Sequence, residues 1–359
     1  MFRIAALFIA FAFLTPAIAA DKTLSLTVAV PFPAKPPICC MAVPAAQDLG
    51  YYKRAGLDVK IVNVGTASTG TIQMLVAGRT DVATASIASG LGAFAAGATD
   101  VRFIGAELNA IYSINKLKWT FVAKDTIKTV ADLKGKTIGI PAGPNPTDPV
   151  YVLISTLLKS AGMTDRDVRW TVAGMPAARV QALTAGRIDF TQMPMEMSYF
   201  VTPDKGLHLL AFDPAGANNG WNGCQCWFTT TKTLADPEKR EAVQRFVDAT
   251  ALAVRDMARD KALFLKAMGL YTDMTVQTPK SIDDTFNYYR LQYMSNGGVN
   301  FEHMNTWLND VYFAAVNPAA KGKFTLKQVS DPSFVKGFLD KNGTDKDAYW
   351  DPPQLIPPG

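Results

Sequence analysis

Histidine is the scarcest chemically versatile residue in this chain of 359 amino acids, which contains only His208 and His303. His208 falls in an apolar segment expected to be a strand and His303 in an expected helix, so we interpret both as packing or surface residues. The sequence also lacks G-x-S-x-G, Walker A and H-E-x-x-H motifs, and no G-x-G-x-x-G opens the chain. Without a catalytic constellation, we expect no enzymatic activity and no cofactor.

Cysteine is almost as rare, and its four residues form two tight groups, Cys39-Cys40 and Cys224-Gln225-Cys226. Only one residue separates Cys224 from Cys226, which is shorter than the spacing of zinc-binding pairs, so no metal site is expected. In an exported protein, one cysteine of the first group could pair with one of the second. Four reduced, packed cysteines are the alternative, and the sequence leaves both open.

Runs of basic residues are also missing. The formal net charge of +5 is spread along the chain, which argues against a dedicated nucleic-acid surface. Hydrophobic residues make up 48% and charged residues 19%, an ordinary mixture for a globular protein. The length is sufficient for two domains.

The one long apolar run lies at the amino-terminal end. Arg3 precedes the run Ile4–Leu14, and Ala17-Ile18-Ala19-Ala20 supplies small residues for a cleavage site. A membrane anchor needs roughly 20 apolar residues, more than this run provides. We therefore expect a secretory signal peptide and an exported protein, most simply in a bacterial periplasm.

One pattern, Q-x-L-x-A-G-R-x-D, occurs twice, at Gln73–Asp81 and at Gln181–Asp189. An alternating apolar run precedes each copy and a short apolar segment follows it, which predicts strand, loop, helix and strand in both halves. Gly78 and Gly186 stand where a helix commonly ends in a left-handed residue. The repeat predicts two similar α/β lobes, and we assign the motif itself a structural role.

Other elements follow from periodicity and from helix-start signals. Val101–Ala106 is an expected strand, Ile111–Ala123 an expected crossing into the second lobe and Cys224–Thr231 the return. Beyond Asp236, an expected N-cap, the pattern becomes helical. The candidate helices are Pro237–Met268, Ile282–Met294, Phe301–Val316 and Pro332–Leu339.

Loops of small residues follow four of the expected strands, at Gly65–Gly70, Ala85–Gly90, Pro141–Asp148 and Gly174–Ala177. In open α/β sheets, ligands bind at this carboxyl-terminal edge, where the free N–H groups of helix starts also point. Each loop alone could be merely a tight strand-to-helix turn. Four such loops in matched positions favour a ligand site between the lobes.

The residues expected to contact a ligand lie in or near these loops. Aromatic and methionine side chains suit an apolar or planar ligand, and Glu196 is an acid that could accept hydrogen bonds from a ligand amine. The set is Phe32, Cys39, Ala67, Ser68, Thr69, Ser86, Gly143, Asn145, Met175, Met193, Glu196, Trp221 and Cys224.

Several motifs, in order over nearly all the mature chain, resemble those of one family. Gly50–Val59 is similar to the family segment G-Y-F-x-x-x-G-L-x-V, and both A-G-R-x-D stretches, Asp132–Ile140 and Asp236–Lys239 also fit. The chain thus resembles the solute-binding proteins of nitrate/taurine/alkanesulfonate-type ABC importers, which share a fold with fungal thiamine-pyrimidine synthase.

This resemblance implies a type II periplasmic-binding-protein fold of the α/β class, with two lobes joined by two crossover strands and a ligand cleft between them. The expected division is a signal peptide at 1–20, lobe 1 at 21–118 and 224–350, lobe 2 at 119–223 and a proline-rich tail at 351–359. The implied function is capture of a small organic molecule (a sulfonate, or a pyrimidine-like or aromatic compound) by hinge closure. Delivery to an ABC permease and its ATPase would follow, and we expect a monomer.

The alternative function is an exported enzyme of the thiamine-pyrimidine-synthase type with altered residues. Asn222–Trp227 resembles that enzyme's cysteine-rich segment, with two cysteines kept. The synthase consumes an active-site histidine and holds pyridoxal phosphate on a lysine. Because Ser89 and Ala85 align with those positions, the same chemistry cannot run here. A ligand-sensing partner for a membrane receptor is a third possibility.

Overall fold

The computed structural model describes residues 22–65, 68–109, 121–145, 148–193, 195–210 and 223–348. The expected signal peptide and the proline-rich tail fall outside these ranges and stay predictions. Within the described ranges, no helix has the length and hydrophobicity needed to cross a membrane.

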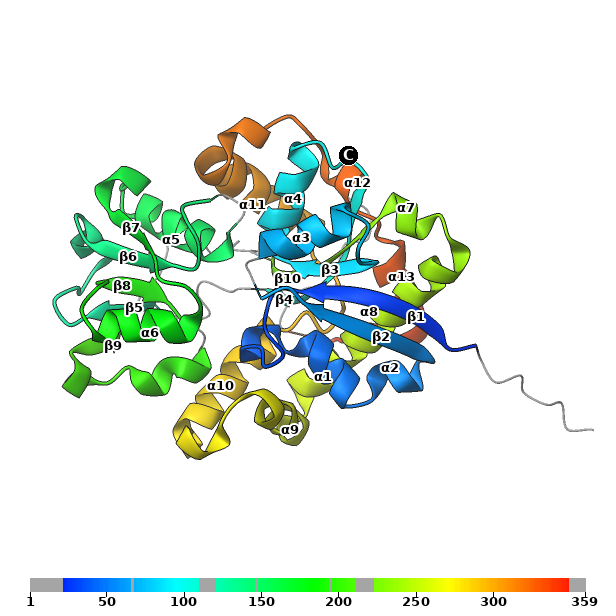
Figure 1. Ribbon diagram of the computed structural model, residues 1–359, viewed down its shortest axis with the longest axis horizontal. Coiled ribbons are helices and arrows are strands. Elements are labelled where there is room, and N and C mark those ends of the chain that lie inside the picture. The colour runs from blue at the N-terminus through cyan, green and yellow to red at the C-terminus, as the bar shows by residue number, and fades with distance from the viewer. Residues whose placement is uncertain are drawn as a thin grey trace, which may run out of the picture.

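Two five-stranded sheets form two lobes that lie next to each other (Figure 1). The first sheet has the order β2-β1-β3-β10-β4 and comprises β1 (Leu24–Val30), β2 (Leu57–Asn63), β3 (Val82–Ala85), β4 (Val101–Asn109) and β10 (Gly223–Thr230). The second has the order β7-β6-β8-β5-β9 and comprises β5 (Phe121–Lys124), β6 (Thr137–Ile140), β7 (Arg169–Val172), β8 (Phe190–Gln192) and β9 (Leu207–Leu209).

The two sheets share one topology. In each, the second strand in the order, β1 or β6, pairs in parallel with both of its neighbours. One strand, β10 or β5, then runs antiparallel to both of its neighbours. This correspondence confirms the two-lobed α/β fold that the repeat predicts. The connections between the lobes fall in 110–120 and 211–222, outside the described residues, so the exact domain limits stay predictions.

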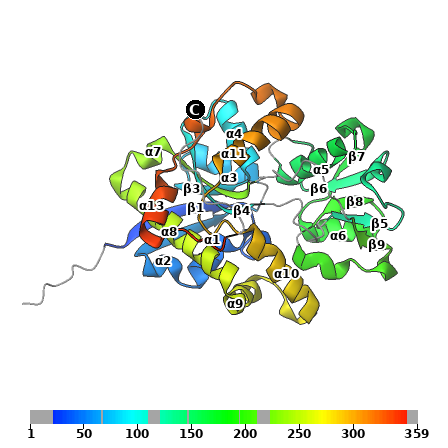
Figure 2. The same cartoon turned by 180° about the vertical axis from the view of Figure 1, so that it is seen from behind.

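Helices cover both faces of the lobe 1 sheet. One core lies under α3 (Ser68–Val76), α4 (Ile87–Ala95), α11 (Phe301–Trp307) and the π-helix η8 (Leu308–Val316). The other lies under α1 (Ala42–Asp48), α2 (Tyr51–Arg54), α8 (Pro237–Arg259) and α13 (Ser333–Asn342), the last two of which are seen from behind in Figure 2. Shorter elements of this lobe are η1 (Ile38–Cys40), α7 (Thr231–Leu234) and α12 (Leu326–Val329).

Lobe 2 is smaller and carries α5 (Pro149–Ser160) and α6 (Pro176–Thr184) over separate apolar clusters. Asp148 caps α5 by accepting a hydrogen bond from the Tyr151 N–H at 2.8 Å, with Pro149 as the first helical residue. The short helix η4 (Met195–Phe200) follows β8.

Three expected helices differ from the observed ones. The single helix expected over Pro237–Met268 is wrong, because Asp260 ends α8 and its carboxylate caps α9 (Lys261–Tyr271). The helix expected at Ile282 begins earlier, as α10 (Pro279–Gln292), since Thr278 forms a capping box. The helix expected over Phe301–Val316 changes to π-helical geometry at Leu308.

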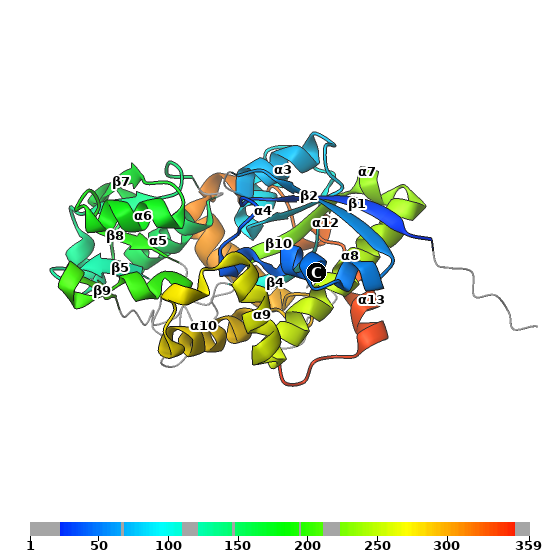
Figure 3. The ribbon, with the colours of Figure 1, turned by 60° about the horizontal axis from the view of Figure 1, so that its bottom comes forward.

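The carboxyl-terminal helices of lobe 1 also contact lobe 2. α5 packs against η8, and Tyr151 of α5 is buried in a cluster that includes Trp307 and Tyr312 of lobe 1. On another side, α10 packs against η4 and Leu291 contacts the lobe 2 core. Figures 1 and 3 show α11 and α10 as the helices of lobe 1 that reach towards lobe 2. Lobe 2 is thus contacted by two separate helical segments of lobe 1.

Candidate functional site between the two lobes

The repeated motif performs the same structural task in both lobes. Asp81 accepts a hydrogen bond from Thr27 N–H at 2.8 Å, and its own N–H donates to Thr27 O at 2.9 Å. Asp189 makes the same pair of bonds with Thr137, at 2.9 and 2.8 Å. The motif aspartates therefore join the start of β3 to β1 and the start of β8 to β6.

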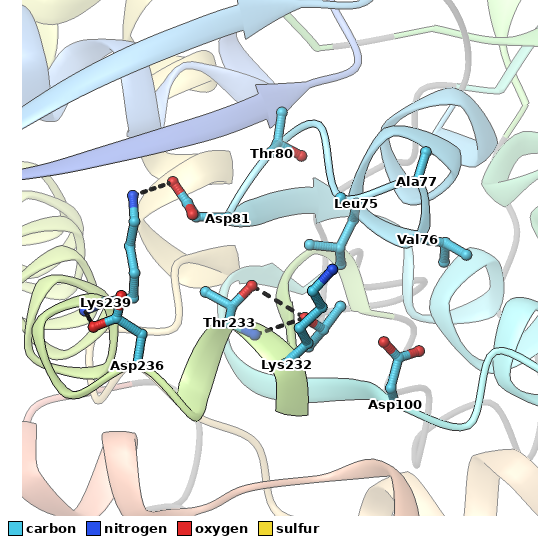
Figure 4. A pocket seen from close by; sticks show the side chains of 12 residues that line it. Leu75, Val76, Ala77, Thr80, Asp81, Asp100, Lys232, Thr233, Asp236 and Lys239 are labelled. Atoms are coloured by element: carbon cyan, nitrogen blue, oxygen red, sulfur yellow. Dashed lines mark hydrogen bonds and ion pairs between the residues drawn. The ribbon is translucent and has the colours of Figure 1, made fainter.

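A lysine completes each of these clamps. Lys239 Nζ lies 2.9 Å from Asp81 Oδ2 in lobe 1 (Figure 4), and Lys124 Nζ lies 2.7 Å from Asp189 Oδ1 in lobe 2. The motif glycines, Gly78 and Gly186, end their helices with φ of 66° and 72°. The predicted structural role of the motif is confirmed, and the loops at the opposite end of the strands are left for a ligand.

In lobe 1, several candidate residues follow the carboxyl ends of β1, β2 and β3. Phe32 is half-buried and lines a hollow of about 230 Å³ together with Cys40. Ser68 begins α3 and is 5% exposed, with half-buried Thr69 next to it. Ser86 is fully buried and caps α4, its Oγ accepting from Ser89 N–H at 3.2 Å.

In lobe 2, the candidates surround the carboxyl ends of β6, β7 and β8. Gly143 and Asn145 are exposed in the loop before α5, and half-buried Met175 is the N-cap residue of α6. Met193, which is 1% exposed, packs in the apolar cluster under α6. Glu196 lies in η4, which packs against α10, but its side chain is not among those described. Ala67 and Trp221, and the side chain of Cys224, also lie outside the described part, so their roles stay predictions.

Arg179 is a buried charged residue at the carboxyl-terminal edge of the lobe 2 sheet, and the sequence analysis did not identify it. It lies on the first turn of α6 and is only 2% exposed. Its Nη1 donates to Gly174 O at 2.7 Å, while Nε and Nη2 donate to Gln192 O at 3.2 and 3.0 Å. The guanidinium thus bridges the loops that follow β7 and β8, between Met175 and Met193.

No carboxylate lies within ion-pair distance of Arg179 among the described residues. Burial lowers the pKa of Arg179 to about 10, and the nearby groups of Asp148 and Cys39 oppose that shift. Burial also raises the pKa of Asp148, while hydrogen bonding and Arg179 act in the other direction. A guanidinium has five N–H donors, and the contacts with the two carbonyls use one donor from each of its three nitrogens, so donors remain for an anion.

The influence of Cys39 on Arg179 also relates the lobes to each other. Cys39 belongs to η1, just beyond the loop after β1 of lobe 1, whereas Arg179 belongs to lobe 2. The loop after β1 in lobe 1 and the start of α6 in lobe 2 therefore come near each other at these two residues. One sequence signal for Arg179 was present: a cation on the first turn of a helix opposes the helix dipole and needs a compensating role.

A second hollow, of about 290 Å³, lies away from this site, next to the first motif (Figure 4). Its lining includes Asp81 and Asp100, which precede β3 and β4, and it therefore lies at the opposite ends of those strands. Lys232, Lys239 and Asp236 also line it, so charges of both signs are mixed there. Among the described residues, no group of three histidine, cysteine or acidic side chains could hold a metal ion.

A family model described as NMT1/THI5 like matches residues 40–261. The chain belongs to this family. The match spans both copies of the repeat, all of the described lobe 2 and the return strand β10. No curated protein matches the sequence at a significant level.

Several solved structures have folds similar to that of this chain. The alkanesulfonate-binding protein SsuA from Xanthomonas axonopodis pv. citri, bound to MOPS, is 18% identical, with a TM-score of 0.65 over 87% of this chain and 99% of that one. The nitrate-binding protein NrtA from Synechocystis PCC 6803 is 11% identical, with a TM-score of 0.62 over 91% of each chain. The Candida albicans CA3427 product, described as having the generic periplasmic binding protein fold, is 14% identical, with a TM-score of 0.61 over 93% and 98%. The fold is that of periplasmic binding proteins.

Proposed function

We propose that this protein is the periplasmic substrate-binding component of an ABC importer. It captures a small organic molecule between its lobes and delivers it to a membrane permease and the ATPase of that permease. The ligand carries an acidic group, such as a sulfonate or carboxylate, on an apolar or planar body. The family membership and the similarity to an alkanesulfonate-binding and a nitrate-binding protein support this proposal.

The observation that carries the proposal is the buried guanidinium of Arg179. Burying a cation away from water is costly unless an opposite charge or several hydrogen bonds compensate. The carbonyls of Gly174 and Gln192 supply part of this compensation, and an acidic ligand group would supply the remainder. Arginine is well suited to this role because its planar fork of donors matches the oxygens of a carboxylate or sulfonate.

The remainder of the ligand would lie among the predicted contacts from both lobes. Met175 offers an apolar surface next to Arg179, and Phe32 and Cys39 offer one from lobe 1. Rotation of lobe 2 towards lobe 1 would then exclude water from the ligand. Because α5 and η4 pack against helices of lobe 1, those contacts would guide the rotation.

We propose binding rather than catalysis. The positions aligned with the lysine and histidine of the fungal synthase are Ala85, which is fully buried in β3, and Ser89, whose Oγ lies 2.8 Å from Ser86 Oγ. Neither side chain could form an imine with pyridoxal phosphate or act as an imidazole. An enzyme of that type would require a different lysine.

A thermal-shift screen of the mature protein tests the proposal. Sulfonates, nitrate, pyrimidines and small aromatic acids would each be added in large excess. A ligand at a hundred times its Kd stabilises the folded state by about 2.7 kcal/mol, which raises the Tm by several degrees in a protein of this size. If no compound of these classes raises the Tm, the proposal is wrong.

A further inference from the structure

Cys39 and Cys40 place two sulfur atoms in contact at the edge of lobe 1 that faces lobe 2. Both belong to η1, a single turn of 3₁₀-helix that follows the proline-rich loop after β1. Their Sγ atoms lie 2.7 Å apart. Because a disulfide bond is about 2.05 Å long, the two atoms need to approach by only about 0.7 Å more to become bonded.

The two thiols differ in accessibility. Cys40 is 6% exposed, and its Sγ accepts a hydrogen bond from Gln225 Nε2 at 3.1 Å, which holds it in place. Cys39 is half-buried, more exposed than Cys40, and its thiol is not in a disulfide. A reagent would therefore meet Cys39 first, with the Cys40 sulfur already positioned behind it.

Cys226, in the other cysteine group, lies on the far side of the sheet. Neighbouring side chains of a strand point to opposite faces, and in β10 Gln225 points towards Cys40. Cys226 instead packs with Ala85 and Phe228 in the cluster under α3 and α4. A bond between Cys40 and Cys226 would have to pass through the sheet, so this pairing is disfavoured. The pairings that involve Cys224 stay predictions, because its side chain is not among those described.

We propose that Cys39 and Cys40 are a modification site at which a small-molecule disulfide, of the glutathione disulfide type, converts the two thiols into a vicinal disulfide. The Cys39 thiolate attacks one sulfur of the oxidant and releases one thiol. The Cys40 thiolate then attacks the Cys39 sulfur of this mixed disulfide and releases the second thiol. Two protons and two electrons pass to the oxidant, which leaves as two thiols, and one bond between the Sγ atoms is gained.

This bond would be labile. The Cα atoms of adjacent residues are 3.80 Å apart across a trans peptide, which is below the usual range of 4.4–6.8 Å for disulfides. Strained and exposed disulfides are the more easily reduced ones. The pair therefore forms a reversible redox site on the wall that faces Arg179. This inference goes beyond the proposed function and requires only contact with an oxidant of the named class.

Peptide mapping tests the proposal on the wild-type protein. Trypsin does not cleave the Lys35–Pro36 bond, so one peptide, Thr23–Lys53, contains both Cys39 and Cys40, while Gly206–Lys232 contains the other group. Protein treated with glutathione disulfide is denatured, alkylated with N-ethylmaleimide and digested. We expect the peptide Thr23–Lys53 without an alkyl group and two hydrogen masses lighter than its reduced form. Prior treatment with dithiothreitol should instead give two alkyl groups.

Three results would overturn the proposal: two alkyl groups on Thr23–Lys53 after oxidation, a glutathione adduct that persists on it, or its cross-link to Gly206–Lys232. The variant Cys39→Ala provides the matched control, because it leaves a single thiol that should take one alkyl group or one glutathione. The variant Cys224→Ala removes one thiol of the other group and should leave the mass shift of Thr23–Lys53 unchanged.

Discussion

Asp81 accepts a hydrogen bond from the backbone N–H of Thr27 at 2.8 Å, and this contact fixes the start of β3 against β1. Asp189 and Thr137 repeat it in lobe 2 at 2.9 Å, and each aspartate is also paired with a lysine. The repeated motif is therefore a clamp at the end of each sheet away from the facing loops. Its role is stability, and ligand recognition is left to the opposite edge.

The variants Asp81→Ala and Asp189→Ala should each destabilise the protein by about 1.5–3 kcal/mol, the usual contribution of a hydrogen bond to a charged group. Urea unfolding followed by circular dichroism measures this loss. Asp58→Ala, at an exposed position of β2, is the control and should change the free energy of unfolding by less than about 0.5 kcal/mol. A loss of ligand affinity without a loss of stability would contradict the structural role.

Acid should weaken the lobe 2 clamp. Burial alone would raise the pKa of Asp189, but hydrogen bonds from Lys124 and the Thr137 N–H more than offset this, and the net pKa lies below its ordinary value of 3.8. A carboxyl with a lowered folded-state pKa stabilises the protein above its unfolded pKa, and the contribution disappears as pH falls through the folded value. The unfolding free energy of Asp189→Ala should therefore fall less steeply below pH 4 than that of the wild type. Equal slopes would argue against the clamp.

Glu107 gives the opposite pH dependence. It is 1% exposed in β4 and accepts a hydrogen bond from Trp227 Nε1 at 2.8 Å. Burial raises its pKa to about 8, against an ordinary value of 4.5. Between these values the folded state retains a proton that the unfolded state has lost, so stability falls as pH rises, by up to about 1.4 kcal/mol per pH unit from this group.

The variant Glu107→Gln removes this titration while keeping an oxygen that can accept from Trp227. Its unfolding free energy should depend less on pH between 5 and 8 than that of the wild type, as measured in urea at several pH values. Glu302→Gln, at an exposed position of α11, is the control and should retain the wild-type slope. An unchanged slope in Glu107→Gln would show that Glu107 is ionised when folded.

The variants Gly78→Ala and Gly186→Ala should each cost about 1 kcal/mol, because an alanine resists the left-handed backbone at φ of 66° and 72°. A Cβ at Gly78 would meet no atom within 4 Å, so this cost is conformational and not steric. Gly143→Ala is the control: it also has open space but no left-handed φ, and its Tm should stay close to that of the wild type. Equal Tm values for all three variants would contradict the helix-end assignment.

The fold was largely predictable because its rules are local. The glycine and aspartate of each motif act within their own strand-helix-strand unit, so the repeat was sufficient to indicate two matching lobes. The break between α8 and α9 was not predictable from the sequence, because Asp260 lies in a charged amphipathic stretch and resembles any surface residue there. Only the structure shows that its carboxylate accepts hydrogen bonds from the N–H groups of Ala262 and Leu263.

The site was less predictable because it depends on contacts distant in sequence. The loops were found from their small residues, but Arg179 is defined by the Gln192 carbonyl, which follows a different strand. The apolar cluster that contains Tyr151, Trp307 and Tyr312 likewise joins segments with no shared local pattern. Sequence periodicity locates the strand-to-helix loops of such a site, whereas the buried guanidinium of Arg179 is recognised only from the three-dimensional structure.

Isothermal titration with the best ligand of the thermal-shift screen tests the central claim most directly. The mature wild-type protein should bind one molecule and return it chemically unchanged. Arg179→Gln should weaken binding by about 30-fold or more, because truncating one partner of a buried charge pair costs at least about 2 kcal/mol. Arg187→Gln removes an exposed charge from the same lobe and should bind like the wild type. Wild-type affinity in Arg179→Gln, with its folding verified by circular dichroism, would contradict the account.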